Sequence, residues 1–270
     1  MLDSQKLPGL MALSVALVLL TILPSAADTW KVYGHAIDKD GRLAYLEEHL
    51  ITYQNGNIAA IETNFYNPNT ERIAKQVSDF THGAQYGSYD FFDERYDYND
   101  GARVMADRIL IYRQKKSSAK LKEKSIPRND SQIVGQGFYQ FVTANLEPLA
   151  RGRVLAAKLV LPAQMGQFDV QVSKRLLQGD RLVLTVKLDN WLLRFFAPNV
   201  EIEYDMKNRR LMRYRGISMV SNSNHKSHEV VTTYDYSQQP SMLSYLAKLR
   251  KSSVPALKLS QKRTEHYIRR

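Results

Sequence analysis

Five carboxylates stand close together in segment 90–101, near enough in sequence to bind a cation or exchange protons: Asp90, Asp93, Glu94, Asp97 and Asp100. An EF-hand calcium loop needs oxygen ligands at positions one, three and five, Gly at six and Glu at twelve. Counted from Asp97, the fifth position is Gly101 and the twelfth is Arg108, so this register does not fit. Two carboxylates can also perform acid–base catalysis, but nothing in the segment sets one pKa apart from another.

The stretch "YDYNDGARV" (96–104) instead matches a pattern that recurs at 37–43, 66–73 and 204–211. Each copy runs from an apolar or aromatic residue through an Asx-rich turn to an Arg and an aliphatic residue. Asp and Asn side chains bond to their own backbone in turns, and Gly accepts positive φ. We therefore predict that Asn99, Asp100 and Gly101 form a hairpin turn without catalytic or metal-binding function.

A second candidate site is "NHKSHE" (224–229), in which two His three residues apart precede a Glu. Zinc proteases place their two His four residues apart on a helix. Here a polar segment leads into a strand-like one, so we predict a hydrated hairpin loop. The chain has no Cys, which excludes thiolate catalysis and Cys-based metal sites. We expect no catalytic residue, no metal and no cofactor, and hence a protein that is not an enzyme.

The net charge of +11 is concentrated in two segments. Segment 113–128 holds seven Lys/Arg and one Glu, and segment 241–270 holds eight Lys/Arg and one Glu. We predict a basic surface loop at 113–128 and a basic, largely disordered tail at 241–270, with "MLSYLAKL" (242–249) as a candidate short helix within the tail. Both can attract polyanions, and the lysines expected to contact an anionic surface are Lys115, Lys116, Lys120, Lys122 and Lys124.

The N-terminal segment 1–27 predicts a secretory signal peptide. Lys6 precedes an apolar run from Leu10 to Leu23, and small residues follow at Ser25 and Ala27. The run is shorter than the roughly 20 residues that a membrane-spanning helix needs. We therefore expect cleavage before Asp28 and export to the periplasm, with an uncleaved anchor as the alternative. In that compartment the polyanion would be an envelope surface rather than nucleic acid.

The rest of the chain, 28–240, has the pattern of a single β domain. Apolar and polar residues alternate in "RLVLTVKL" (181–188) and "VEIEY" (200–204), the period of a strand with one buried face. Further turn signals stand at 53–58 and 177–182. We expect a mainly β (α+β) fold, namely a curved antiparallel meander or half-barrel of about ten strands.

One segment, 131–150, has helical spacing of its apolar residues and breaks this pattern. Pro148 should end or kink its last turn. We expect one amphipathic helix here that covers the apolar face of the sheet.

The densest apolar stretch after the signal peptide is "NWLLRFFAPN" (190–199). It is either a buried strand or the lining of an apolar pocket between sheet and helix, because bulky residues would occupy both of its faces. The predicted ligand-binding residues are Trp191, Leu193 and Phe195 here, with Phe138 and Phe141 of the helix.

Three segments are similar in sequence to uncharacterised periplasmic proteins of Gram-negative bacteria, which the chain therefore resembles: "FVTANLEPLARG" (141–152), 191–218 and "EVVTTYDY" (229–236). The expected architecture is also remotely similar to the half-barrel of the lipoprotein carriers and their outer-membrane receptors. The resemblance implies a fold and no catalytic residue.

Two functions remain open. One is a periplasmic, non-enzymatic binding protein for an apolar or amphipathic envelope ligand such as a lipid. The other is an envelope interaction protein with a filled core that docks on anionic surfaces through its basic loop and tail. The oligomeric state is left undetermined.

Overall fold

The computed structural model describes residues 28–188, 200–222 and 225–252. Its strands are β1 (Asp28–Asp38), β2 (Leu43–Gln54), β3 (Asn57–Tyr66), β4 (Arg72–Asp79), β5 (Ser88–Asp93), β6 (Tyr98–Val104), β7 (Arg108–Gln114), β8 (Lys122–Pro127), β9 (Gln132–Val134), β10 (Leu155–Leu161), β11 (Gly166–Gln178), β12 (Arg181–Leu188), β13 (Val200–Asp205), β14 (Arg210–Ile217) and β15 (Glu229–Asp235). Its helices are α1 (Gly137–Ala144), α2 (Leu146–Ala150), the 3-10 turn η1 (Pro162–Gln164) and α4 (Met242–Lys251).

All fifteen described strands form one sheet, in the order β8-β7-β6-β5-β4-β3-β2-β1-β15-β14-β13-β12-β11-β10-β9. Neighbouring strands are antiparallel except for β9 and β10, which are parallel. The first strand therefore lies near the middle of the sheet, between β2 and β15. The expected mainly β, antiparallel fold is confirmed.

Most of the expected turns occur where the sequence places them. Asn55 and Gly56 both have positive φ between β2 and β3, as a two-residue hairpin turn requires. Gly179 and Arg209 have positive φ in the turns that follow β11 and β13. Strand β12 covers 181–188, as its alternation predicts, and Leu182 and Leu184 are buried.

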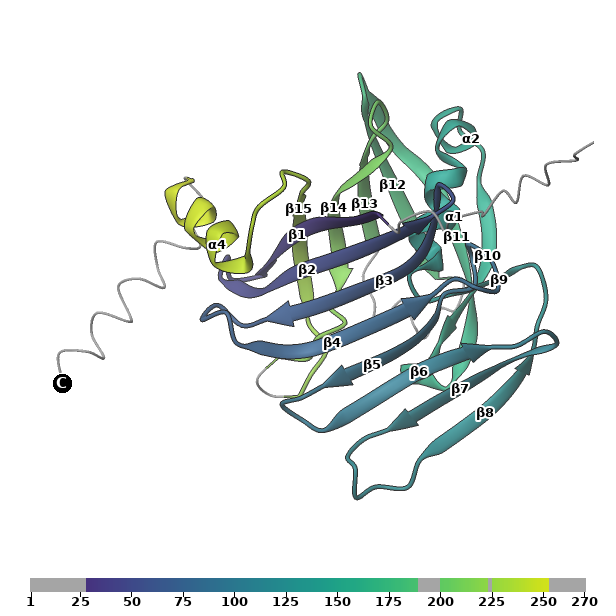
Figure 1. The fold of residues 1–270 in the computed structure, drawn as a ribbon. Helices are drawn as coiled ribbons and strands as arrows, with labels where there is room; N and C mark the ends of the chain where they lie inside the picture. The colour runs from purple at the N-terminus through teal and green to yellow at the C-terminus, as the bar shows by residue number, and fades with distance from the viewer. Residues whose placement is uncertain (1–27, 189–199, 223–224, 253–270) are drawn as a thin grey trace, which may run out of the picture.

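The sheet curls until one edge meets the other half of the chain. Val134 of β9 donates from its backbone N–H to the carbonyl oxygen of Gln85 (2.9 Å) and accepts from Gly87 (3.2 Å). The helix that follows approaches the same segment so closely that a Cβ on Gly137 would lie 2.3 Å from the Gln85 oxygen. Figure 1 shows the two halves of the curled sheet, in which the strands β2–β8 lie at a steep angle to the upright strands β10–β13.

Three apolar clusters fill the fold. The largest lies inside the first half and includes Phe65, Phe91 and Ile111. A second, the α1 cluster, packs α1 and α2 onto β10–β13 and is centred on Val142, Leu146, Leu149, Leu182, Leu184 and Ile202. The third lies on the opposite face of β1 and β2, under α4.

The predicted single helix over 131–150 is wrong in its extent. Residues Gln132–Val134 form β9, and α1 begins at Gly137. The helix is interrupted at Asn145, whose φ of −113° leaves the helical region. Pro148 lies in the following short helix, where its missing N–H cannot continue the hydrogen bonds of α1.

The predicted basic loop at 113–128 is also corrected, because most of it is a hairpin. Residues 122–127 form β8, which pairs with β7 from Arg113↔Lys122 to Arg108↔Pro127. Ile126 is buried opposite Ile109, and this contact anchors an otherwise exposed strand. Such exposed strands lack the alternation that marks a strand in sequence, which is why about ten were expected and fifteen are found.

The tail begins with an ordered helix, α4, at the position of the candidate short helix 242–249. Ser241 caps α4 by accepting from the Ser244 N–H (3.2 Å). Tyr245 is fully buried and stacks on Tyr33, with ring centroids 5.1 Å apart, and Leu246 is buried on the same face. Residues 253–270 lie outside the described part, as does the predicted signal peptide, 1–27. None of the described helices is long and apolar enough to cross a membrane.

A series of hydrogen-bonded polar side chains, buried or half-buried, joins the start of α1 to the inner face of β2–β4. Gln136, which precedes α1, donates from its amide to the Thr63 hydroxyl (2.9 Å) and accepts from Ser78 (2.8 Å). Thr63 in turn is 2.9 Å from His49 Nδ1. Gln136 therefore links two strands through partners that are 1% and 0% exposed.

The hydrogen bonds of this series all point in the same direction. His49 Nε2 lies 2.8 Å from Glu47, and Gln76 donates to Ser78 (3.1 Å). With the His49 proton on Nε2, each member donates toward the Glu47 carboxylate, which is only 5% exposed. Gly34 faces this carboxylate, and a Cβ there would lie 3.2 Å from its oxygen. Every link thus supports a charge that would be costly to bury alone.

Replacing Gln136 by Leu tests this connection. The substitution leaves the Thr63 and Ser78 hydroxyls short of a partner, so the free energy of unfolding should fall by about 2–4 kcal/mol. Gln164→Leu, at an exposed amide, should change it by less than about 0.5 kcal/mol. Urea unfolding followed by circular dichroism measures both variants. Equal small effects would show that the hydrogen bonds of Gln136 do not stabilise the fold.

Candidate functional site

The predicted ligand-binding residues fall into two groups. Phe138 and Phe141 lie on α1, half-buried, and pack against the α1 cluster. Trp191, Leu193 and Phe195 lie outside the described residues. The structure therefore places the helical pair beside an apolar interior, and their role in binding stays a prediction.

Tyrosine rings extend from α1 toward the end of β14. Tyr139 stacks on Tyr204 with centroids 6.3 Å apart and an interplanar angle of 15°. The Tyr204 hydroxyl bonds to Thr143 (3.4 Å). Burial raises the pKa of Tyr236, and the neighbouring Tyr139 and Tyr204 raise it further. Tyr236 thus lies near the stacked pair Tyr139–Tyr204 beside the helix.

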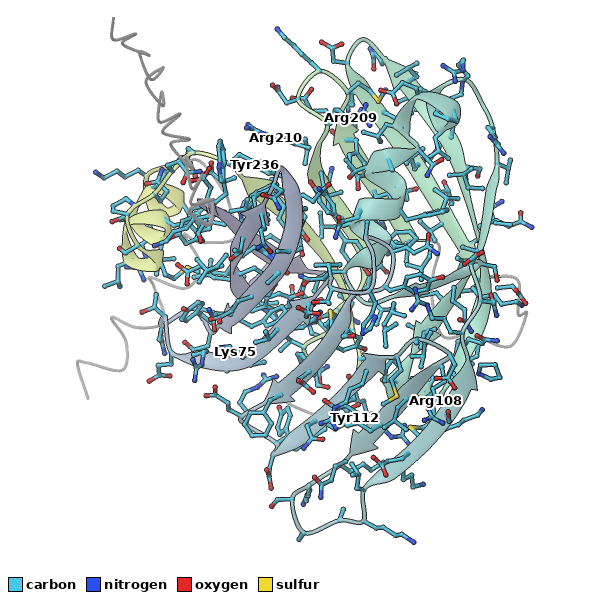
Figure 2. The ribbon with its side chains drawn as sticks, turned by 45° about the vertical axis from the view of Figure 1, so that its right-hand side comes forward. Lys75, Arg108, Tyr112, Arg209, Arg210 and Tyr236 are labelled. Atoms are coloured by element: carbon cyan, nitrogen blue, oxygen red, sulfur yellow. The ribbon has the colours of Figure 1, made fainter. Side chains whose placement is uncertain are left out.

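Arg210, the first residue of β14, lies over the outer end of this series. Its guanidinium carbon is 4.9 Å from the centre of the Tyr236 ring and 6.0 Å from that of Trp30. The preceding Arg209 has positive φ and binds Glu147 and the Thr143 carbonyl, which fixes the turn against the helices. Figure 2 shows Arg210 beside Tyr236, between α4 and the strands that carry α1.

Next to Arg210 the surface is hollowed, with a volume of about 320 Å³. We call this the α4 hollow, because Tyr245 and Leu249 of α4 form one wall. The other walls come from β1, β13, β14, β15 and the residue after β15: His35, Asp205, Arg210, Met212, Thr233, Tyr234, Asp235 and Tyr236. Its size and mixed lining are those of a small ligand site.

The ionisable groups of the α4 hollow differ in their surroundings. His35 Nδ1 is 2.9 Å from the Tyr245 hydroxyl, and burial lowers the pKa of this imidazole. Burial would raise the pKa of Asp235, but hydrogen bonds from Lys248 and Ser237 lower it overall. Hydrogen bonds from Asn208 chiefly lower the pKa of Asp205. At neutral pH the hollow therefore has a neutral imidazole, two carboxylates already bonded elsewhere, and Arg210.

Sequence reasoning missed this site. The stretch containing Arg210 is recognisable only as a turn, and Trp30 and Tyr236 only as strand residues. The exposed fraction of Trp30, 45%, is high for its size, but exposure is not visible in sequence. Only the neighbourhood of α1 was anticipated, through Phe138 and Phe141.

The five predicted surface lysines all have exposed side chains. Lys115, Lys116 and Lys120 lie in the turn between β7 and β8, and Lys122 and Lys124 lie on β8. Figure 2 shows Arg108 and Tyr112 of β7 far from Arg210, at the opposite end of the molecule. The structure thus brings the lysines together on one hairpin and separates them from the α4 hollow.

The outer face of β11–β14 carries a second hollow, of about 270 Å³, whose charges are mostly paired. Arg175 binds Glu201, and Arg181 binds Glu203 at 2.7 Å. Arg213, exposed on the same strand as Arg210, lies opposite Glu203 in the register. This face is a solvated ladder of opposite charges.

The predicted polar loop at 224–229 is described from His225 onward. His225 has positive φ and its ring lies 3.7 Å from that of Tyr96. Burial lowers the pKa of His228. Among the described residues, no group of three His, Asp or Glu side chains could hold a metal ion.

The predicted turn at Asn99–Asp100–Gly101 is wrong, because these residues lie within β6. The chain turns earlier, at residues 94–97, where Asp97 has positive φ. Gly101 is needed for packing instead, since a Cβ would lie 2.2 Å from the Tyr89 carbonyl oxygen and 2.4 Å from the Tyr112 hydroxyl. Gly101 thus looks like a turn residue in the sequence, but in the structure it allows neighbouring strands to approach closely.

The five carboxylates also do not share a site. Tyr112 donates to Asp90, Arg95 binds Asp93 at 2.7 Å, and Arg72 binds Glu94 at 2.7 Å. Asp97 accepts from the Ser117 N–H (2.8 Å).

Asp100 is the exception in burial. It is 5% exposed, opposite Phe91, and accepts a hydrogen bond from the Tyr98 hydroxyl (2.6 Å). Burial raises its pKa to about 6, although hydrogen bonds from Tyr98 and Tyr89 and the charge of Arg113 act in the opposite direction. Asp100 is thus the acid of the cluster whose pKa is raised, and its hydrogen-bond donors are the tyrosines Tyr98 and Tyr89.

Comparison with known proteins yields little similarity. No family model and no curated protein matches the sequence. Among solved structures, the crystal structure of a β-barrel-like protein of the domain of unknown function DUF1849 from Brucella abortus matches with a TM-score of 0.34 and 10% identity. The match covers 77% of this chain and 97% of that chain. So few identities transfer no residue role.

Asp100 makes stability depend on pH. Because its pKa is about 6 in the folded protein, against an ordinary value of 3.8 for this side chain, the folded state holds the proton more tightly than the unfolded state does. Its contribution to the free energy of unfolding, about 3 kcal/mol well below pH 4, should therefore fall by about 2 kcal/mol as the pH rises from about 4 to about 7. Asp100→Asn removes this titration, so the stability of the variant relative to wild type should rise by that amount over the same range. A constant difference in urea unfolding at pH 4, 5, 6 and 7 would contradict the prediction.

Proposed function

We propose that the protein is a periplasmic, non-enzymatic binding protein whose ligand is an apolar or amphipathic molecule of the cell envelope, such as a lipid. The observation that carries the proposal is the exposed indole of Trp30, which with Tyr236 flanks Arg210 at the α4 hollow. Aromatic rings provide large apolar contact area, and an adjacent cation can hold a polar group.

The predicted export of the protein also supports this proposal. Segment 1–27 has the composition of a cleavable signal peptide, so the domain would meet envelope lipids. Tyr139 and Tyr204 stack beside the α1 cluster against which Phe138 and Phe141 pack, and Tyr236 of the hollow lies near both tyrosines. These features favour reversible binding rather than chemistry.

Binding is tested with N-phenyl-1-naphthylamine, an apolar probe that fluoresces when it leaves water. The wild-type protein should bind it saturably, and Trp30→Ala should weaken binding by about tenfold because it removes one of the two aromatic rings that flank Arg210. Phe92→Ala is the matched control, since Phe92 is similarly exposed (41%) on β5, whereas the rings that flank Arg210 are those of Trp30 and Tyr236. Absence of saturable fluorescence with the wild-type protein would refute the proposed function.

A second candidate function is docking on anionic envelope surfaces, and the exposed lysines of the β7–β8 hairpin favour it. Like charges gathered at one end attract an anionic surface by about 1 kcal/mol each. The basic residues after 252 would add to this attraction.

Sedimentation with phosphatidylglycerol vesicles tests docking. Binding should weaken steeply between 50 and 500 mM NaCl because salt screens the charges. Changing the five hairpin lysines to Gln should reduce it by more than about a thousandfold, because each lysine contributes about 1 kcal/mol. The control changes five exposed lysines outside the hairpin and the tail: Lys39, Lys174, Lys187, Lys207 and Lys226. Equal losses in both variants would exclude the hairpin as the docking surface.

A further inference from the structure

We infer that the α4 hollow selects ligands with an anionic group and that Arg210 binds this group, so that the ligand is an anionic amphiphile. The inference rests on the proposed binding function and adds the class of ligand and the residue that determines it.

The guanidinium of Arg210 is held in place without being neutralised. The faces of Tyr236 and Trp30 flank it at 4.9 and 6.0 Å. Such contacts orient a cation and leave the edge of the guanidinium free to donate hydrogen bonds. Within the described part of the chain, Arg210 forms no ion pair, whereas Arg175, Arg181 and Arg215 each bind a carboxylate.

The two carboxylates of the hollow are engaged elsewhere. Asp205 accepts from the Lys207 and Asn208 N–H groups and the Asn208 amide, at 2.6–3.2 Å. Asp235 binds Lys248 of α4. Arg210 contributes a little to the low pKa of Asp205, but the two groups do not form an ion pair.

The remaining walls suit an apolar portion of the ligand. Met212, Tyr236, Tyr245 and Leu249 line the hollow, and the imidazole of His35 is held by the Tyr245 hydroxyl. A guanidinium at the edge of such walls binds carboxylates and phosphates, often through two parallel hydrogen bonds. The two halves of the site thus match the two halves of an anionic amphiphile.

The test compares three ligands with the same twelve-carbon chain, each below its critical micelle concentration at pH 7.5: dodecyl phosphate, dodecanoate and dodecyl maltoside. Isothermal titration calorimetry with the full chain should show at least tenfold tighter binding of one or both anions than of the maltoside. A preference for the phosphate over the carboxylate would identify phosphate as the recognised group, and the reverse order would identify carboxylate.

Variants assign the preference to a residue. Arg210→Gln should remove the roughly tenfold advantage of the anions over the maltoside, while Arg210→Lys, which keeps the charge, should retain part of that advantage. Arg213→Gln is the matched control, an exposed arginine three residues along the same strand that does not line the hollow. Its binding should equal that of wild type.

The outcomes separate this inference from the proposed function. Equal binding of all three ligands would overturn the inference and leave the binding function standing. Equal loss of the anion advantage in the Arg210→Gln and Arg213→Gln variants would also overturn it, because general surface charge would then explain the preference. Failure of all three ligands to bind would overturn both.

Discussion

The pairing of β1 with β15 is the contact on which the rest of the structure depends. It runs from Tyr33↔Asp235 to Asp38↔Val230 and joins residues some two hundred positions apart. Without it, β1–β8 and β9–β15 would be separate sheets, with β1 and β15 as exposed edges. The same pairing brings Trp30 of β1 near Arg210 and Tyr236. It also delivers α4, which follows β15, to the outer face of β1 and β2, so the α4 hollow exists only because this pair of strands meets.

Inside the curled sheet, apolar and polar contacts have separate tasks. The apolar clusters supply the burial, and the α1 cluster holds the helices on β10–β13. The chain of hydrogen bonds from Gln76 to Glu47 instead fixes where the start of α1 lies relative to β2–β4, through Gln136. Hydrophobic burial is nondirectional, whereas buried hydrogen bonds have demanding geometry, so the polar chain gives the curled sheet one closed arrangement.

Charge distribution separates structural from functional surface. On the outer face of β11–β14, arginines alternate with glutamates and are neutralised in pairs. At the α4 hollow, aromatic rings hold Arg210 while the nearby carboxylates bond to other groups. On the β7–β8 hairpin, lysines extend into solvent, as on many edge strands that resist pairing with other chains. Of these three surfaces, only the hollow combines an oriented cation with apolar walls, which is why the binding proposal centres there.

The sequence by itself determined the antiparallel β class, five of the six marked turns and the alternation of β12 and β13, because these follow from local backbone preferences and side-chain period. It located the helix near Phe138 and Phe141, but not its start. It misplaced the turn at Gly101, since a glycine demanded by a neighbouring strand looks the same in sequence as one demanded by positive φ. Tertiary structure alone decided the strand order, the ordering of α4 and the meeting of Trp30, Arg210 and Tyr236. Those contacts join distant positions, and their free energy depends on burial and geometry that no local pattern encodes.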